Sequence, residues 1–164
     1  MMKYKNTEFY KIIKDIYELD EVKRLDKCKH HGITRLDHCL RVSYYTYTIT
    51  KALHLNYKDA TRAALLHDFF TDEVSGLKMY GRFSKHPKIA YNNASKYFKL
   101  NKLQKDIIVK HMWPCTLTPP KYFESWIVDI IDDISAVFER GYVTRKELQF
   151  GASFLYLFIL SRFR

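Results

Sequence analysis

The sequence predicts an all-α protein, a single-domain helical bundle of about seven helices. Apolar residues recur at spacings of three and four through most of the 164 residues, which is the period of a helix that buries one face. Only 5 glycines and 4 prolines interrupt that pattern, and no segment shows a competing strand signal. The composition is 47% hydrophobic, as in a packed domain, so residues 1–164 are expected to form one domain.

Three helices are expected in the first 70 residues. The apolar residues of FYKIIKDIYEL recur at helical spacing and predict an amphipathic helix over about residues 7–24. The segment KCKHHGIT is polar and contains a glycine, so it indicates a loop. Thr34 can cap a second helix, over about residues 35–54, and Asn56 can cap a third with the sequence YKDATRAALLHDFF.

Two further helices are expected in the middle of the chain. The segment TDEVSGLKMYGRF contains two glycines without a clear period, and it is expected to be a loop. Pro87 suits a first helical turn, where its missing amide is not needed, so a helix is predicted from Pro87 to about Lys99. Asn101 can cap the next helix, which the Trp113-Pro114 pair ends.

The last two predicted helices are strongly apolar. Pro119 and Pro120 introduce a long helix that Gly141 ends, and Thr144 can cap a final helix over about residues 144–163. This C-terminal helix is expected to be a packing helix, with a homodimer face left open as an alternative.

Charge and cysteine content narrow the classes of function. The net charge of +10 favours phosphate-bearing partners, although the lysines are scattered and a solvated basic surface is equally compatible. No recognised nucleic-acid motif is present, so a nucleic-acid partner is disfavoured. Three cysteines without a CxxC pair argue against disulfides or a cysteine zinc site and favour the cytoplasm. No apolar run approaches the ~20 residues of a membrane span.

The residues that carry chemistry are histidines and aspartates. His67 and Asp68 are adjacent at the end of the buried segment AALLHD, where an imidazole and a carboxylate can reach one divalent cation. His38 lies 29 residues earlier in the first half of a predicted helix, and ESWIVDIIDDISAVFE places aspartates on a later helix. From the residues alone, Asp129, Asp132 and Asp133 of this segment are all candidates for the last ligand.

This set resembles the HD-domain superfamily, whose signature is H…HD…D. The matching segments are TRLDHCLRV, AALLHDFF and the IDDISA stretch, and the resemblance spans about residues 34–140, the expected metal-binding core. It implies an all-α, metal-dependent phosphohydrolase. It also implies that His38, His67, Asp68 and Asp132 hold a metal, because the superfamily places its last aspartate in a pattern like ADKISA.

Two more histidines extend the resemblance. Superfamily branches that hold two metals show the order H…HD…H…H…D, which His86 and His111 complete in this sequence. The resemblance implies that His86 and His111 hold a second metal and that Asp68 bridges the pair and is catalytic. The expected cofactor is one or two divalent transition-metal ions, Fe, Mn, Co, Ni or Zn, supplying a hydroxide that attacks a phosphate ester or anhydride.

The expected substrate is a phosphate-bearing small molecule, a nucleotide such as a dinucleoside polyphosphate. The alternative is a non-catalytic HD module that binds or senses a nucleotide. One departure favours that alternative slightly, because many hydrolytic members read HDxxK and this sequence has Thr71 in place of the lysine. Arg82, Lys85 and Lys110 are the candidate substrate-binding residues that can supply the missing positive charge.

Overall fold

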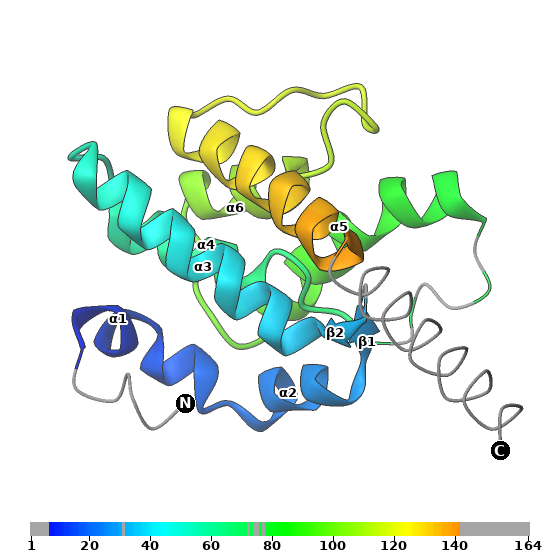
Figure 1. Ribbon diagram of the computed structural model, residues 1–164, viewed down its shortest axis with the longest axis horizontal. Coiled ribbons are helices and arrows are strands. Elements are labelled where there is room, and N and C mark those ends of the chain that lie inside the picture. The colour runs from blue at the N-terminus through cyan, green and yellow to red at the C-terminus, as the bar shows by residue number, and fades with distance from the viewer. Residues whose placement is uncertain (1–6, 31, 72, 74–75, 77, 142–164) are drawn as a thin grey trace, which may run out of the picture.

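The structure is a computed structural model that describes residues 7–141 apart from 31, 72, 74, 75 and 77. These residues form a helical bundle with one short hairpin (Figure 1), so the predicted all-α class is confirmed. A final helix occupies residues 123–141, and the predicted helix over 144–163 lies outside the described residues. In chain order, the other elements are α1 (Glu8–Tyr17), α2 (Asp20–Lys23), η2 (Arg24–Lys27), β1 (Lys29–His30), β2 (Ile33–Thr34), α3 (Arg35–Ala52), α4 (Tyr57–Leu66), α5 (Met79–Ser95) and α6 (Lys102–Lys110).

The N-terminal helix is shorter than predicted. The Thr7 hydroxyl caps α1 by accepting from the Tyr10 amide, but α1 ends at Tyr17, and Leu19 is extended before α2 begins. The buried residues explain the break, because Ile16 and Val22 are six positions apart and cannot share one helical face. A turn between α1 and α2 lets both side chains enter the core.

The segment predicted as a loop after residue 27 contains a small hairpin. β1 and β2 pair antiparallel in a register that places Lys29 opposite Thr34. Gly32 lies between them with a φ of 89°, a left-handed conformation that glycine adopts without strain. The sequence analysis found no strand signal here, so it missed these two very short strands.

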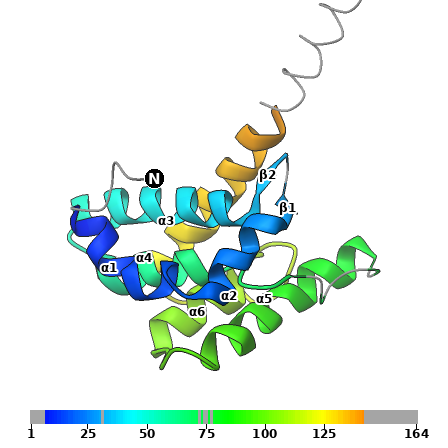
Figure 2. The ribbon, with the colours of Figure 1, turned by 90° about the horizontal axis from the view of Figure 1, so that it is seen from below.

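α3 and α4 form the centre of the bundle, and their predicted caps are present. Thr34 accepts from the Asp37 amide at 3.1 Å, and Asn56 accepts from the Asp59 amide at 3.4 Å. α4 packs against α1, α3, α5 and α6, and Figure 2 shows it between α3 and α6. Its alanines Ala60, Ala63 and Ala64 are completely buried, which allows the neighbouring helices to approach closely.

The start of α5 differs from the prediction. The helix begins at Met79, eight residues before Pro87, so Pro87 and His86 lie inside it and not at its start. A proline inside a helix removes one backbone hydrogen bond. Here both His86 and Pro87 are buried, so packing of the side chains offsets that loss. The glycine-containing segment predicted as a loop therefore contributes its last residues to α5.

The last two described helices follow the predicted order. Asn101 and Gln104 form a capping box at the start of α6, and His111 is the C-cap residue directly after α6. The helix over residues 123–141 then returns beside α3 (Figure 1). Among the described residues, no helix is both long and apolar enough to span a membrane.

Candidate metal centre

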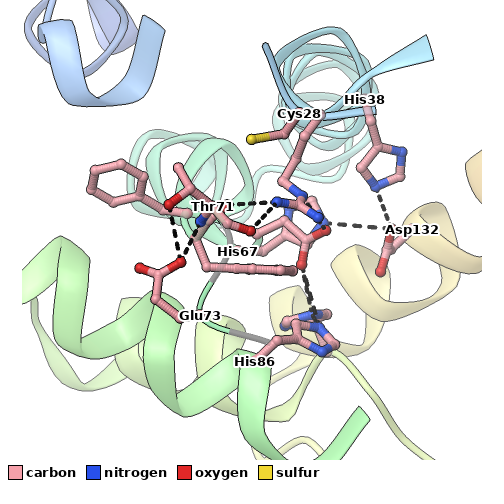
Figure 3. Close-up of polar contacts among 12 residues, drawn as sticks. Cys28, His38, His67, Thr71, Glu73, His86 and Asp132 are labelled. Atoms are coloured by element: carbon pink, nitrogen blue, oxygen red, sulfur yellow. Dashed lines mark hydrogen bonds and ion pairs between the residues drawn. The ribbon is translucent and has the colours of Figure 1, made fainter. Parts of the chain in front are cut away.

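Six side chains that are far apart in the sequence meet in the interior of the bundle. Helix ends supply three of them, because a histidine is the C-cap residue directly after both α4 and α6, and Asp68 follows the first of these. The remaining three come from α3, α5 and the helix over residues 123–141. All six are buried, and Figure 3 shows the labelled members converging between the helices. They are His38, His67, Asp68, His86, His111 and Asp132.

Asp132 joins two of the histidines on one side of the centre. Its Oδ1 atom lies 2.8 Å from Nε2 of His38 and 3.5 Å from Nε2 of His67 (Figure 3). The two imidazole rings pack edge to face with their centroids 5.3 Å apart. Two ring nitrogens and a carboxylate oxygen therefore face a common point, which is the arrangement that a metal ligand set requires.

Asp68 has the same relationship to the other two histidines. Its Oδ1 atom lies 3.3 Å from Nε2 of His86 and 3.7 Å from Nε2 of His111. The Nε2 atoms of these two histidines are only 2.9 Å apart. Asp68 thus stands between the His86–His111 pair and the side of the centre formed by His38 and His67.

Backbone carbonyls fix the ring orientation of two histidines. Nδ1 of His67 is 2.7 Å from the Ala64 carbonyl, and Nδ1 of His111 is 2.8 Å from the Ile108 carbonyl. A carbonyl only accepts, so each Nδ1 carries the proton and each Nε2 presents its lone pair to the centre. Both rings reach a carbonyl three residues earlier because both stand at a helix end, where the last carbonyls have no partner within the helix.

These residues fit a divalent metal. Ligand atoms of His38, His67 and Asp68 lie within 4.8 Å of one another, and so do those of two further groups. Moreover, Nε2 of His67 is fully buried and makes no hydrogen bond with the described residues, which is costly unless a ligand satisfies it. Mixed imidazole and carboxylate ligands suit Fe, Mn, Co, Ni or Zn better than Mg. The two further groups are His67, His111 and Asp132, and Asp68, His86 and His111.

The electrostatics couple the histidines to the carboxylates. Burial disfavours a charged His38, but hydrogen bonds to Asp132 and Glu139 outweigh burial and raise the pKa of His38 to about 10. Burial alone would raise the pKa of Asp132, yet the charge of His67 and the hydrogen bond to His38 hold it well below its usual range. The pKa of Asp68 is likewise lowered, against burial, by His111, His67 and His86. Both aspartates are therefore carboxylates at neutral pH, as ligands must be.

The structure separates the three aspartates that the residues alone left open. Asp132 lies among the histidines, whereas Asp129 accepts a hydrogen bond from the Trp113 amide at 3.2 Å. Asp133 is exposed, because one position further along the helix rotates its side chain by about 100° away from that of Asp132.

The structure describes the side chains of two of the three cations proposed as substrate contacts. Lys85 is exposed on α5, and Lys110 pairs with Asp106 at 2.9 Å. The side chain of Arg82 lies outside the described residues.

Among the described residues, Arg35 is a cation that lies beside Asp68, and sequence reasoning missed it. Its Nε is 3.9 Å from Oδ2 of Asp68, and its guanidinium stacks 3.8 Å above the Phe70 ring. Nη1 of Arg35 also donates to the carbonyls of Phe70 and Thr71, at 2.6 and 3.2 Å. Arg35 is three residues before His38, one turn along α3, but this spacing alone does not distinguish it from an ordinary surface arginine.

Glu139 was missed as well. It is buried, and its Oε2 atom lies 3.0 Å from Nδ1 of His38, while its Oε1 atom accepts from Arg41 at 3.0 Å. Glu139 is seven residues after Asp132, two turns along the same helix, so both carboxylates face α3.

Comparison with known proteins agrees with this geometry. The family model described as the HD domain matches residues 35–137, which is more than half of the chain and includes all six side chains of the centre. No curated protein and no solved structure matches the chain.

Proposed function

This chain belongs to the HD domain family, and from that premise we propose that it is an enzyme that hydrolyses a phosphate ester or anhydride of a nucleotide. The family is one of metal-dependent phosphohydrolases, and the buried histidines and aspartates are compatible with its metal site. The observation that carries the proposal is the convergence of His67 and Asp68 with ligand-type atoms from four other segments.

The proposed ligands divide into two overlapping sets. His38, His67, Asp68 and Asp132 are assigned to one ion, and His86 and His111 are assigned to a second. Asp68 belongs to groups on both sides of the centre, which supports a bridging role. A divalent metal bound there lowers the pKa of a water ligand and offsets negative charge on a phosphoryl oxygen.

The protein residues prepare the site for that chemistry. The Nδ1 protons of His67 and His111 are held by carbonyls, so neither ring has to lose a proton from Nε2 to become a ligand. Arg35 holds the turn after Asp68 and supplies positive charge near that carboxylate. A nucleotide substrate is proposed on the net charge of +10 and on the family, and phosphate is the group it would present.

The test uses neighbouring aspartates as a matched pair. Asp132→Ala removes a proposed ligand, whereas Asp133→Ala removes an exposed carboxylate one position away on the same helix. Phosphate release is measured for each metal-loaded protein with nucleoside mono-, di- and triphosphates and dinucleoside polyphosphates. Activity in wild type and Asp133→Ala, with a loss of at least about 100-fold in Asp132→Ala, supports the proposal. Equal activity in the two variants contradicts it.

A second candidate is a non-catalytic HD module that binds a nucleotide. Thr71 stands where many hydrolytic members have a lysine, and the described lysines proposed to replace it are exposed or paired elsewhere. This candidate predicts that the wild-type protein binds a nucleotide in a metal-dependent way and releases no product over hours. Turnover that Asp132→Ala removes would exclude it.

A further inference from the structure

His38 differs from the other histidines of the centre in how its ring is held. Both of its nitrogens face carboxylates from one helix, Oδ1 of Asp132 at 2.8 Å and Oε2 of Glu139 at 3.0 Å. We propose that Glu139 is a positioning residue, which holds the His38 ring so that its Nε2 atom is presented to a metal. The proposal rests on the proposed function, because it assigns Glu139 a role at that same metal centre.

The position of His38 in its helix explains why a carboxylate is needed. His67 and His111 stand at helix ends and use the free carbonyl three residues earlier. His38 is the fourth residue of α3, and the carbonyls around it accept from amides four residues later within that helix. A ring in this position must find its Nδ1 acceptor outside its own helix, and Glu139 supplies one.

The buried carboxyl group of Glu139 is paired with an arginine of α3. Its side chain is fully buried, and Arg41, one turn after His38 on α3, donates to its Oε1 atom at 3.0 Å. Burying an unpaired carboxylate in this position would cost free energy of folding. The contact between Arg41 and Oε1 reduces this cost and leaves Oε2 of Glu139 available to His38. The contacts form a continuous series from Arg41 through Glu139 and His38 to Asp132.

A carboxylate on the far nitrogen of a metal-binding histidine fixes its tautomer and makes it a stronger ligand. Loss of such a partner typically costs 10–100-fold in metal affinity. The competing interpretation is that Glu139 only attaches the helix over residues 123–141 to α3. If Glu139 positions His38, its removal weakens metal binding. If Glu139 is only a structural contact, its removal lowers the stability of the fold and leaves metal affinity unchanged.

The experiment is a Co²⁺ titration of the full-length, metal-free protein, with affinity and the visible spectrum of the bound ion recorded together. The variants are Glu139→Ala and Glu139→Gln, and the control is Glu124→Ala. Glu124 accepts from the Asn56 amide at 3.1 Å, so it attaches the same helix to the start of α4 without touching a histidine. Thermal stability of each metal-free protein is measured in parallel.

We expect Co²⁺ to bind Glu139→Ala about 10–100-fold more weakly than wild type and with an altered spectrum. Glutamine retains one acceptor oxygen, so Glu139→Gln should recover part of the affinity and should fold if the alanine variant does not. Glu124→Ala should lower the melting temperature and leave Co²⁺ affinity within about twofold of wild type, since the hydrogen bond of Glu124 is to the Asn56 amide and not to a proposed ligand.

Unchanged affinity and spectrum in both Glu139 variants, with a lowered melting temperature, would overturn the proposal and leave Glu139 a structural contact. Wild-type protein that binds Co²⁺ and hydrolyses no phosphate compound would refute the proposed activity alone, because the comparison of variants does not use turnover. Wild-type protein that binds no Co²⁺ would overturn both.

Discussion

The Nε2 atoms of His86 and His111 lie 2.9 Å apart, although the two residues are 25 positions apart in the sequence. Nδ1 of His111 donates to the Ile108 carbonyl, so a neutral His111 can only accept through Nε2. His86 must then donate through its own Nε2 in the metal-free protein. A cation that both nitrogens bind would replace that single shared proton, so metal binding would change the contact between these two rings.

The first prediction concerns the number of ions. Wild-type protein loaded with a transition metal is expected to carry about two ions per chain, because the six side chains form overlapping groups of three. His86→Ala should reduce this to about one, and Asp68→Ala, which removes the carboxylate shared by two groups, should abolish binding. Elemental analysis after gel filtration measures all three. One ion in wild type that persists in His86→Ala would assign His86 and His111 structural roles.

Local signals in the sequence predicted most of the fold. The predicted caps Thr34, Asn56 and Asn101 are confirmed, and each accepts from the amide three residues later, so a cap can be recognised from the local sequence. The start of α5 was missed because Pro87 and a nearby glycine are local signals, whereas burial of His86 against His111 depends on the tertiary structure.

The candidate site shows the same division. The six proposed ligands were nominated from the resemblance of their order in the sequence to that of the HD-domain superfamily. Arg35 and Glu139 could not be nominated in this way, because their partners are 35 and 101 residues away and an arginine or glutamate on a helix is ordinarily a surface residue. Supporting residues of a site are defined by what they contact, so only the structure identifies them.

The second prediction tests Arg35. Its guanidinium binds two carbonyls after Asp68 and stacks on Phe70, a combination that a lysine cannot reproduce. Arg35→Lys is expected to lower the free energy of unfolding by about 2 kcal/mol and to reduce turnover at least about tenfold, since the turn that carries Asp68 loses its support. Denaturant unfolding and initial rates of phosphate release measure the two effects.

The matched control for Arg35 is Arg62→Lys. Arg62 forms a two-point ion pair with Asp15 at 2.6 and 2.7 Å and binds the Ile12 carbonyl, joining α4 to α1 away from the centre. Arg62→Lys should lower stability without changing turnover per folded molecule. Equal loss of turnover in both variants would show that Arg35 acts only through global stability.

The third prediction concerns pH. Burial, together with the charge of Asp133, raises the pKa of Asp129 to about 7. The folded protein therefore binds a proton that the unfolded chain has already released above about pH 4, so stability from this group falls as pH rises toward 7. Asp129→Asn keeps an acceptor for the Trp113 amide and cannot ionise. The metal-free variant should be more stable than wild type at about pH 8, and the difference should shrink or reverse at about pH 5. A difference in melting temperature that is the same at both pH values would contradict the assignment.

The fourth prediction concerns an apolar face on the helix over residues 123–141. Ile130, Ile134, Val137 and Phe138 are 51–71% exposed among the described residues, a density of large apolar side chains that normally marks a contact surface. The residues that follow include the apolar run FLYLFIL, and the sequence predicts that 144–163 form a packing helix. Because this segment begins a few residues beyond the exposed face, we expect it to cover that face.

A cycle of variants tests this expectation. Ile134→Lys with Val137→Lys should lower the free energy of unfolding of the full chain by more than about 2 kcal/mol, since burying one large aliphatic side chain is worth about 1.5–3 kcal/mol. In a chain that ends at residue 143, the same pair should change stability by less than about 0.5 kcal/mol, as substitutions on a solvated surface do. A small effect in both chains would show that the face stays in solvent. A large effect that depends on protein concentration would assign the face to a second copy of the chain, because only an association between molecules makes stability rise with concentration.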